Sequence, residues 1–475
     1  MSRSLARLVF PSLRPRGGSF AHEAPRIARA LAAGVGGFIV FGGTRAVVAR
    51  LTQDLRRRAR EPILIGADLE RGVAQQITDL TDLPPPAALG FVGDTDATHA
   101  AGIITAREAR AVGISWAFAP VCDLDLEVAN PIVGTRSFGA FPERVGAHAA
   151  AWIRGAQEHG VLACAKHYPG HGRTTVDSHQ TLPVVETAAA ELLASDVQPF
   201  AAAVASGVAS VMTAHVAYPS WDPSGSAATF SLPILGHLRS ALGFQGIVVT
   251  DALIMAGATS AQAEGPATAA AVAAGCDALL YPRNFEGVVL ALDAAAASGQ
   301  IAQARATEAL ERIDRAAASW RPVNPVSEPL DIAANRAFAE GIASRSLHLI
   351  ERGTALAIPR ATMVTVVDDD IGGPYSVGPR DVFASGLRAA GRLAVRTKGA
   401  GRVVALYAEP RSWKGRASLS ERSLAQLQSA TDAALVVLFG HPRLATQIPG
   451  NAPVLVAWHG QPLMQRVAAR WVASS

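Results

Sequence analysis

The feature that most constrains the fold is an alternation of short apolar runs and helix-forming stretches over the first 280 residues. Each run spans four to six residues, the length of a buried strand, and ends near Pro, Gly or polar residues. The eight runs are Leu5–Phe10, Gly37–Phe41, Ile63–Ala67, Ser115–Pro120, Val161–Ala165, Ala209–Thr213, Ile247–Thr250 and Asp277–Tyr281. The stretches between them include Ala21–Ala33, Arg45–Arg60, Ala97–Val112, Ala188–Ser206 and Gly265–Ala274. This alternation predicts an α/β fold that begins with a (β/α)8 barrel of the TIM type.

The end of the predicted barrel is marked by a helix-forming stretch and then a proline-rich segment. We expect a last helix at Ile301–Trp320 and assign residues 1–322 to the barrel. Arg321–Pro329 contains three prolines, which is typical of a linker, and we place the linker at 323–331.

Residues 332–475 repeat the alternation on a smaller scale. After a predicted helix at Ile332–Ser344, the apolar runs are Met363–Val367, Val403–Tyr407, Ala433–Phe439 and Pro453–Trp458. Further helices are predicted at Arg380–Ala390, Leu419–Thr431 and Leu463–Val472. We interpret this part as an αβα sandwich domain, an open sheet with helices on both faces. It holds no recognisable chemical motif, and we expect it to brace or partly cover the barrel.

Charge and cysteine content exclude some classes of partner. The 475-residue chain carries 43 Lys and Arg against 39 Asp and Glu, and the arginines are scattered rather than gathered into an aromatic-interleaved basic stripe. This pattern argues against nucleic-acid binding. No run of 18 apolar residues is present, so we expect no membrane span. Three cysteines in or beside apolar runs predict buried free thiols, and the N-terminus has too short an apolar stretch for a signal peptide, so we expect a cytoplasmic protein. We expect a monomer or a homodimer.

Polar side chains stand just after five of the predicted strands. They are Asp68 with Glu70, Cys122 with Asp123, Lys166 with His167, His215 and Asp251. The active site of such a barrel lies at the carboxyl ends of its strands, so we expect these groups to meet at one rim. Position alone leaves two roles open for Asp251, a nucleophile that attacks carbon or a helix N-cap.

The segment Lys166–His179, KHYPGHGRTTVDSH, concentrates titratable groups in a Pro/Gly loop after a strand. Asp177 and His179 are two residues apart, which places both side chains on the same side of an extended loop. A carboxylate beside an imidazole can fix its tautomer and raise its basicity. A metal site formed by His167, His171, Asp177 and His179 is a weaker alternative, because the spacing matches no common metal motif.

Three further charged residues have two possible roles. Asp68, Arg136 and Lys166 can bind the vicinal hydroxyls of a sugar or form structural ion pairs.

Five segments, in order, resemble those of family 3 glycoside hydrolases, in the branch of bacterial β-N-acetylhexosaminidases. The Lys166–His179 loop resembles that family's K-H-[FY]-P-G-H-G-x4-D-S-H loop. The other four segments are ADLERG, NPIVGTRSFG, SVMTAHVAYP and LRSALGFQGIVVTDALIMAGA. They cover the first 320 residues, whereas residues 332–475 resemble the second domain of some members only loosely.

The resemblance implies a retaining exo-β-N-acetylglucosaminidase that acts on terminal β-linked N-acetylhexosamine in cell-wall fragment turnover. It implies that Asp251 is the nucleophile and that Asp177 and His179 form the acid/base dyad. The sugar-binding positions that it implies are Asp68, Arg136, Lys166 and His167. The expected substrate is a carbohydrate, with muropeptide fragments as one candidate, and no cofactor or metal is expected.

The chain departs from the family's D-x-E-G-G-R-V-Q-R segment, because Arg71 replaces a glycine and Gln76 replaces an arginine. An aglycone preference is therefore not carried over. Three alternatives stay open: a β-glucosidase, a glycoside phosphorylase using the same site, and a catalytically inactive sugar-binding protein.

Overall fold

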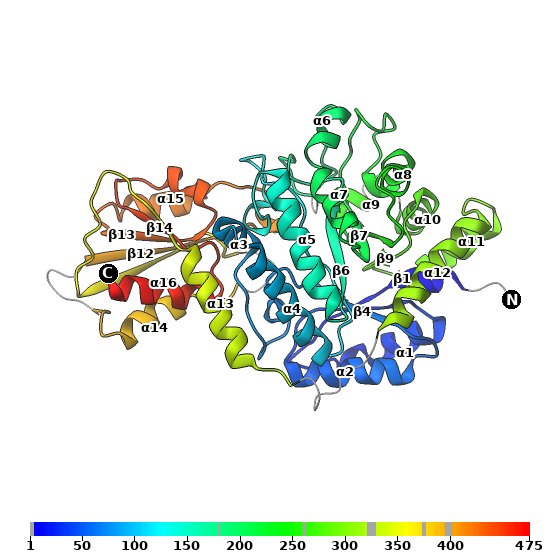
Figure 1. Cartoon of the computed structure of the whole chain (residues 1–475), viewed down its shortest axis with the longest axis horizontal. Coiled ribbons are helices and arrows are strands. Elements are labelled where there is room, and N and C mark those ends of the chain that lie inside the picture. The colour runs from blue at the N-terminus through cyan, green and yellow to red at the C-terminus, as the bar shows by residue number, and fades with distance from the viewer. Residues whose placement is uncertain (1–3, 179–180, 260–262, 321–328, 373–376, 395–400) are drawn as a thin grey trace. The chain divides into compact units, whose positions relative to one another are not determined.

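The computed structural model describes residues 4–178, 181–259, 263–320, 329–372, 377–394 and 401–475. By its contacts the chain forms two compact units, many of whose elements are labelled in Figure 1. The first, here called the barrel unit, comprises Met1–Thr81, Thr95–Leu124 and Ala140–Ile332. The second, here called the C-terminal unit, comprises Asp82–Asp94, Asp125–Gly139 and Ala333–Ser475.

The barrel unit is built on parallel strands taken in sequence order. A seven-stranded sheet has the order β2-β3-β4-β5-β6-β7-β8, and β1 pairs with β9. The strands are β1 Val9–Phe10, β2 Ser12–Leu13, β3 Gly37–Val40, β4 Leu64–Ala67, β5 Trp116–Ala117, β6 Leu162–Tyr168, β7 Ser210–Thr213, β8 Ile247–Thr250 and β9 Leu279–Leu280. Every predicted strand of the barrel contains or overlaps one of them, and the TIM-like α/β prediction is confirmed.

Hydrogen bonds through β1 and β9 join the two edges of the seven-stranded sheet. Val9 lies opposite Leu279, and the Tyr281 N–H donates to the Phe10 carbonyl at 3.0 Å. On the other side, the Thr250 N–H of β8 donates to the Ala278 carbonyl at 3.0 Å. Since a closed sheet has no unpaired edge, these bonds complete the barrel.

The first predicted strand begins later than expected. Leu5–Leu8 forms a 3-10 helix (η1), capped by the Ser4 hydroxyl, and the strand runs from Val9 to Leu13 with an interruption at Pro11. Proline has no N–H to donate to a ladder, which splits the strand into β1 and β2.

Helices connect the barrel strands, largely where the composition predicts them. They are α1 Ala24–Ala33, α2 Arg45–Arg58, α4 Thr95–Ala111, α5 Pro142–Glu158, α6 Ala189–Ala194, α7 Gln198–Ala205, α8 Leu232–Ser240, α9 Ala256–Thr259, α10 Glu264–Ala274, α11 Phe285–Ala297 and α12 Gln303–Ser319. Short 3-10 turns are η2 Ala21–Glu23, η3 Val73–Gln75 and η5 Ala228–Phe230. The single helix predicted over Ala188–Ser206 is two helices, because Pro199 occupies the first turn of a new one.

The C-terminal unit contains a five-stranded sheet of order β10-β14-β13-β12-β11. Its strands are β10 His348–Ile350, β11 Thr362–Asp368, β12 Gly401–Ala408, β13 Leu435–Gly440 and β14 Val454–Val456. β10 runs antiparallel to β14, and the other pairs are parallel. Four of these strands lie at predicted runs, whereas β10 was not predicted.

Helices flank this sheet on both sides (Figure 1). They are α3 Pro86–Val92, α13 Ile332–Ser346, α14 Val382–Ala389, α15 Glu421–Gln428 and α16 Pro462–Ser474, with 3-10 turns η4 Gly134–Arg136, η6 Ser412–Lys414 and η7 Pro442–Gln447. Phe383 and Leu387 of α14 pack with Ala468 and Val472 of α16 against the buried side chains of β12 and β13. Burying this apolar stripe is what stabilises the unit.

Cys122, Cys164 and Cys276 are all buried and free, as predicted. In the described ranges no helix is long and apolar enough to cross a membrane. The predicted linker at 323–331 lies mostly outside the described residues.

Candidate active site

Four of the predicted site residues lie at the carboxyl ends of three barrel strands. Asp68 follows β4, Lys166 and His167 belong to the last residues of β6, and Asp251 follows β8. Because β6 and β8 flank β7 in the sheet, their ends lie near each other. The structure thus brings these four residues to one rim, where barrels of this type hold their sites.

Lys166 lies between two carboxylates. Its Nζ is 2.8 Å from Asp68 Oδ1 and 2.7 Å from Glu70 Oε1. The exposed fractions of the side chains are 2% for Lys166, 5% for Glu70 and 31% for Asp68. Glu70 is therefore a buried counter-ion, whereas Asp68 is accessible to a ligand. A buried ammonium needs such pairing because desolvation of an isolated charge is costly.

His167 has an aspartate near each of its two ring nitrogens. Its Nδ1 is 2.7 Å from Asp123 Oδ2, and its Nε2 is 3.9 Å from Asp251 Oδ2. Burial would raise the pKa of Asp123, but the charge of His167 and its hydrogen bond outweigh burial and lower that pKa. An ionised Asp123 fixes the proton on Nδ1 and orients the ring, as a carboxylate does in many active sites.

Asp251 combines partial exposure with a backbone hydrogen bond. Its side chain is 21% exposed, and its Oδ1 accepts the Ala252 N–H at 2.7 Å. No regular helix begins directly after it, because α9 starts at Ala256. The position therefore fits the helix N-cap alternative poorly and leaves a carboxylate at the rim.

The loop after β6 is held by a buried histidine. His171 donates its backbone N–H to Asp123 Oδ1 at 2.7 Å, and its ring bonds to Thr174 Oγ1 at 2.8 Å and Ser178 Oγ at 3.1 Å. Burial lowers the pKa of His171 to about 4. The imidazole is therefore neutral near pH 7 and serves as a fixed hydrogen-bonding strut.

The far end of this loop contains the predicted dyad. Asp177 is buried, and His179 lies outside the described residues. The Ser178 carbonyl accepts the Gly257 N–H at 3.0 Å. A Cβ at Gly257 would meet that carbonyl at 3.1 Å and His215 Cβ at 3.0 Å, a tight contact that favours glycine at this position. The dyad loop is thus attached to the segment that follows Asp251.

His215, at the end of β7, is a second buried imidazole beside Asp251. Its Nδ1 is 2.8 Å from Thr229 Oγ1. Burial lowers the pKa of His215, although the Asp251 carboxylate opposes that effect. In the part of the chain that the structure describes, no group of three or more His, Cys, Asp or Glu could hold a metal ion.

Arg136 belongs to the C-terminal unit. It ends the 3-10 turn η4, and its Nη1 donates to the Ile132 carbonyl at 3.1 Å. The segment Asp125–Gly139 that carries it leaves the barrel after β5 and returns before α5.

The predicted site residues do not include two carboxylates, Asp123 and Glu70, that pair with predicted site residues in the structure. Asp123 was recognised as a polar strand end, and Glu70 as a neighbour of Asp68, but neither was assigned a role. Their roles depend on Lys166 and His167, which are distant in sequence. The usable signal is their place within three residues of the end of an apolar run.

Comparisons with known proteins agree with the predicted family. The glycosyl hydrolase family 3 N-terminal domain matches residues 14–316. A β-N-acetylglucosaminidase/β-glucosidase from Cellulomonas fimi is 34% identical over 367 residues, covering 73% of this chain and 65% of that protein. A β-hexosaminidase from Thiobacillus denitrificans is 37% identical over 274 residues, covering 54% of this chain and 75% of that protein.

Solved structures are similar over the whole chain. A family 3 β-N-acetylglucosaminidase from Paenibacillus sp. str. FPU-7 has a TM-score of 0.88 at 26% identity and covers 100% of this chain and 96% of that one. A β-glucoside phosphorylase has a TM-score of 0.89 at 21% identity, covers 99% of this chain and 92% of that one, and shares the fold. With the family match, these findings establish that the chain belongs to glycosyl hydrolase family 3.

Proposed function

We propose that the chain is a retaining, exo-acting β-N-acetylglucosaminidase that releases terminal β-linked N-acetylhexosamine, with cell-wall fragments as its substrates. The observation that carries this proposal is the partly exposed Asp251 carboxylate, 3.9 Å from the His167 ring and at the same rim as the Lys166–Asp68 pair. The names of the relatives support the substrate class.

In the first step, an Asp251 oxygen attacks the anomeric carbon and the bond to the leaving oxygen breaks. His179 gives its proton to that oxygen, and Asp177 holds the imidazole for this transfer. The product is a glycosyl ester of Asp251. In the second step, His179 removes a proton from water, the water oxygen bonds to the anomeric carbon, and the ester bond breaks. Two inversions give net retention.

A histidine suits both steps because its ordinary pKa is near neutral pH, where the acid and base forms are both available. Most retaining glycosidases use a carboxylic acid for this task. The roles of Asp177 and His179 follow from the family resemblance.

The remaining residues bind and orient the sugar. The accessible Asp68 carboxylate can accept hydrogen bonds from sugar hydroxyls, while Lys166 donates to them and stays paired with Glu70. His167, with its ring oriented by Asp123, presents Nε2 towards Asp251. Arg136 is the fourth proposed sugar-binding residue.

A β-glucosidase is the second candidate. The Cellulomonas fimi relative is named for both activities. The two activities differ in the substituent at the sugar's second carbon, which an N-acetylglucosaminidase must accommodate.

The test compares the p-nitrophenyl β-glycosides of N-acetylglucosamine and glucose. We expect a higher kcat/KM for the N-acetylglucosaminide and a β-anomeric first product. The Asp251→Ala variant should lose about 1,000-fold or more in kcat while it keeps its fold and its sugar affinity. An exposed aspartate, Asp432→Ala, is the matched control and should keep full activity. A folded Asp251→Ala enzyme with near-wild-type kcat would contradict the proposed mechanism.

A further inference from the structure

The loop that carries Arg136 has a defined internal structure. The Asp125 N–H donates to the Gly139 carbonyl at 2.9 Å and closes the segment Asp125–Gly139. The buried Asn130 side chain accepts the N–H groups of Ile132 and Val133 at 3.0 and 2.8 Å. These bonds set the backbone that leads into η4, where Arg136 lies. A displacement at the start of the loop would therefore move Arg136.

The start of this loop is clamped by one arginine from η7. Arg443 Nη1 donates to the Glu127 carbonyl at 2.8 Å and to the Val128 carbonyl at 3.0 Å, and Nη2 pairs with Asp125. The Arg443 side chain is 15% exposed. The planar guanidinium fixes three acceptors at once, which a flexible ammonium does less well.

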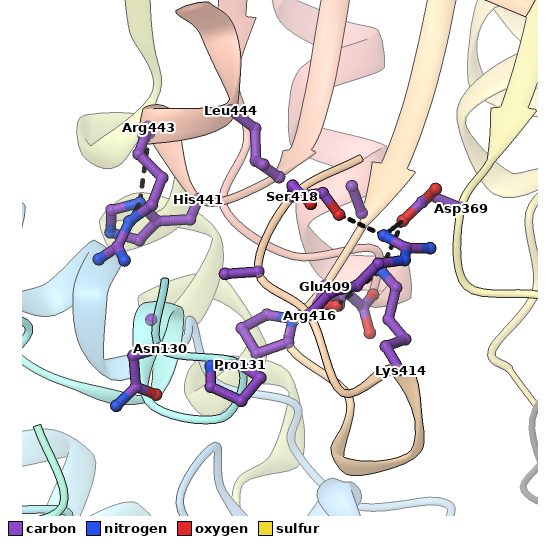
Figure 2. A pocket seen from close by; sticks show the side chains of 14 residues that line it. Asn130, Pro131, Asp369, Glu409, Lys414, Arg416, Ser418, His441, Arg443 and Leu444 are labelled. Carbon is purple, nitrogen blue, oxygen red and sulfur yellow. Dashed lines mark hydrogen bonds and ion pairs between the residues drawn. The ribbon is translucent and has the colours of Figure 1, made fainter. Parts of the chain in front are cut away.

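His441 holds the guanidinium in place from the side. Its Nδ1 accepts the Arg443 Nε–H at 2.9 Å and the Arg443 backbone N–H at 3.2 Å, and its Nε2 is 2.9 Å from Asp125 Oδ2. Figure 2 shows the two side chains in contact, with Asn130 and Pro131 in the same pocket. Burial would raise the pKa of Asp125, but His441 and Arg443 outweigh it and lower that pKa. The Asp125 carboxylate is therefore ionised near neutral pH.

A close backbone approach tightens the same contact. A Cβ at Gly134, the first residue of η4, would lie 2.9 Å from Pro410 Cγ. Gly134 also has a φ of +40°, which favours glycine. The turn that carries Arg136 is thus packed against the segment after β12 as well as clamped by η7.

We infer that the C-terminal unit positions the sugar-binding arginine, with Arg443 and His441 as the positioning residues that hold the loop of Arg136. This inference rests on the proposed function, in which Arg136 binds the sugar. It gives the C-terminal unit a role in substrate affinity that no motif in its sequence indicates.

The test is a double-mutant cycle between Arg443→Met and Arg136→Met. Alone, Arg443→Met should raise KM by about 10- to 100-fold and lower kcat much less, since misplacing a binding group weakens affinity while the nucleophile stays in place. In the Arg136→Met background, Arg443→Met should raise KM by about twofold or less, because the side chain that Arg443 positions is gone.

The matched control is Arg352→Met. Arg352 also donates to a backbone carbonyl of the C-terminal unit, that of Ile448 at 2.6 Å. Its loss should leave KM unchanged. If Arg443→Met does not fold, Asp125→Asn replaces it in the same cycle.

The outcomes separate this inference from the proposed function. Additive effects of Arg443→Met and Arg136→Met on KM, in an enzyme that hydrolyses the N-acetylglucosaminide, overturn the inference alone. A wild-type enzyme that prefers the β-glucoside overturns the proposed substrate, and the cycle is then measured with that substrate. An equal KM increase for Arg352→Met would show a general effect of the unit's stability and would also overturn the inference.

Discussion

At the scale of single residues, the two carboxylates around Lys166 have different tasks. Both lie within 2.8 Å of the same Nζ, but the Asp68 side chain is 31% exposed and that of Glu70 only 5%. A partly exposed carboxylate can exchange its protein partner for a sugar hydroxyl, whereas a buried one cannot. Similar distances therefore do not imply similar roles.

We expect opposite phenotypes from Asp68→Asn and Glu70→Gln. Asp68→Asn should lower kcat/KM by about 10- to 100-fold, the loss of a charged hydrogen bond, with little change in Tm. Glu70→Gln should cost roughly 2 kcal/mol in unfolding free energy, because Lys166 then loses its buried counter-ion at a place that water does not reach, whereas at the partly exposed Asp68 water can compensate. Steady-state kinetics measures kcat/KM and urea unfolding measures the stability of both variants. A Glu70→Gln enzyme with wild-type stability would contradict the assignment.

At the scale of elements, apolar runs that stop at polar or Pro/Gly residues predicted the strands well. Burial on both faces of a parallel strand leaves an apolar run in the sequence. β10 was missed because it has only three residues and follows α13 with one residue between them. Arg443 and Asp125 are 318 positions apart, so no local pattern could indicate that they meet.

For the same reason, residues at strand ends are easier to predict from the sequence than the residues with which they pair. Asp68, Lys166, His167 and Asp251 were recognised because each lies at or next to the end of an apolar run. The Asp123–His167 pair joins the ends of two different strands 44 positions apart, and only the parallel register of β5 and β6 brings them together.

The loop after β6 makes a pH-dependent contribution to stability through His171. Its pKa is lowered to about 4 in the folded state from the ordinary 6.5. The unfolded chain therefore binds more protons between these values, and stability falls as the pH decreases from 6.5 towards 4. The pKa difference of His171 between the folded and unfolded states corresponds to about 3 kcal/mol of unfolding free energy.

We expect His171→Gln to be less stable than the wild type at about pH 7.5. Between about pH 7.5 and about pH 5, the unfolding free energy of the variant should fall less than that of the wild type. The measurement is the urea midpoint of both proteins at the two pH values. His99→Gln, at a half-buried position of α4, is the control for a histidine substitution outside this loop. Parallel pH profiles for wild type and His171→Gln would refute this account.

At the scale of the whole molecule, the charges at the barrel rim bear on which acceptor completes the reaction. In the proposed glycosyl-enzyme Asp251 is an uncharged ester, so the described rim carboxylates that keep their charge are three: Asp68 and Glu70, which pair with Lys166, and Asp123, which pairs with His167. The positive charge of Lys166 is already compensated by its two partners. A phosphate dianion that approaches the glycosyl-enzyme would therefore be repelled by net negative charge, whereas neutral water would not be.

We accordingly expect hydrolysis to dominate over phosphorolysis, although a neutral imidazole base at His179 would repel phosphate less than a carboxylate would. The fold does not decide the question, since related folds host different acceptors. The measurement is product analysis with an N-acetylglucosaminide in about 10 mM phosphate, with the same ionic strength of chloride as the control. N-acetylglucosamine should be the main product in both buffers. If N-acetylglucosamine 1-phosphate dominates in phosphate, the carboxylates at the rim do not control the acceptor and the enzyme is a phosphorylase.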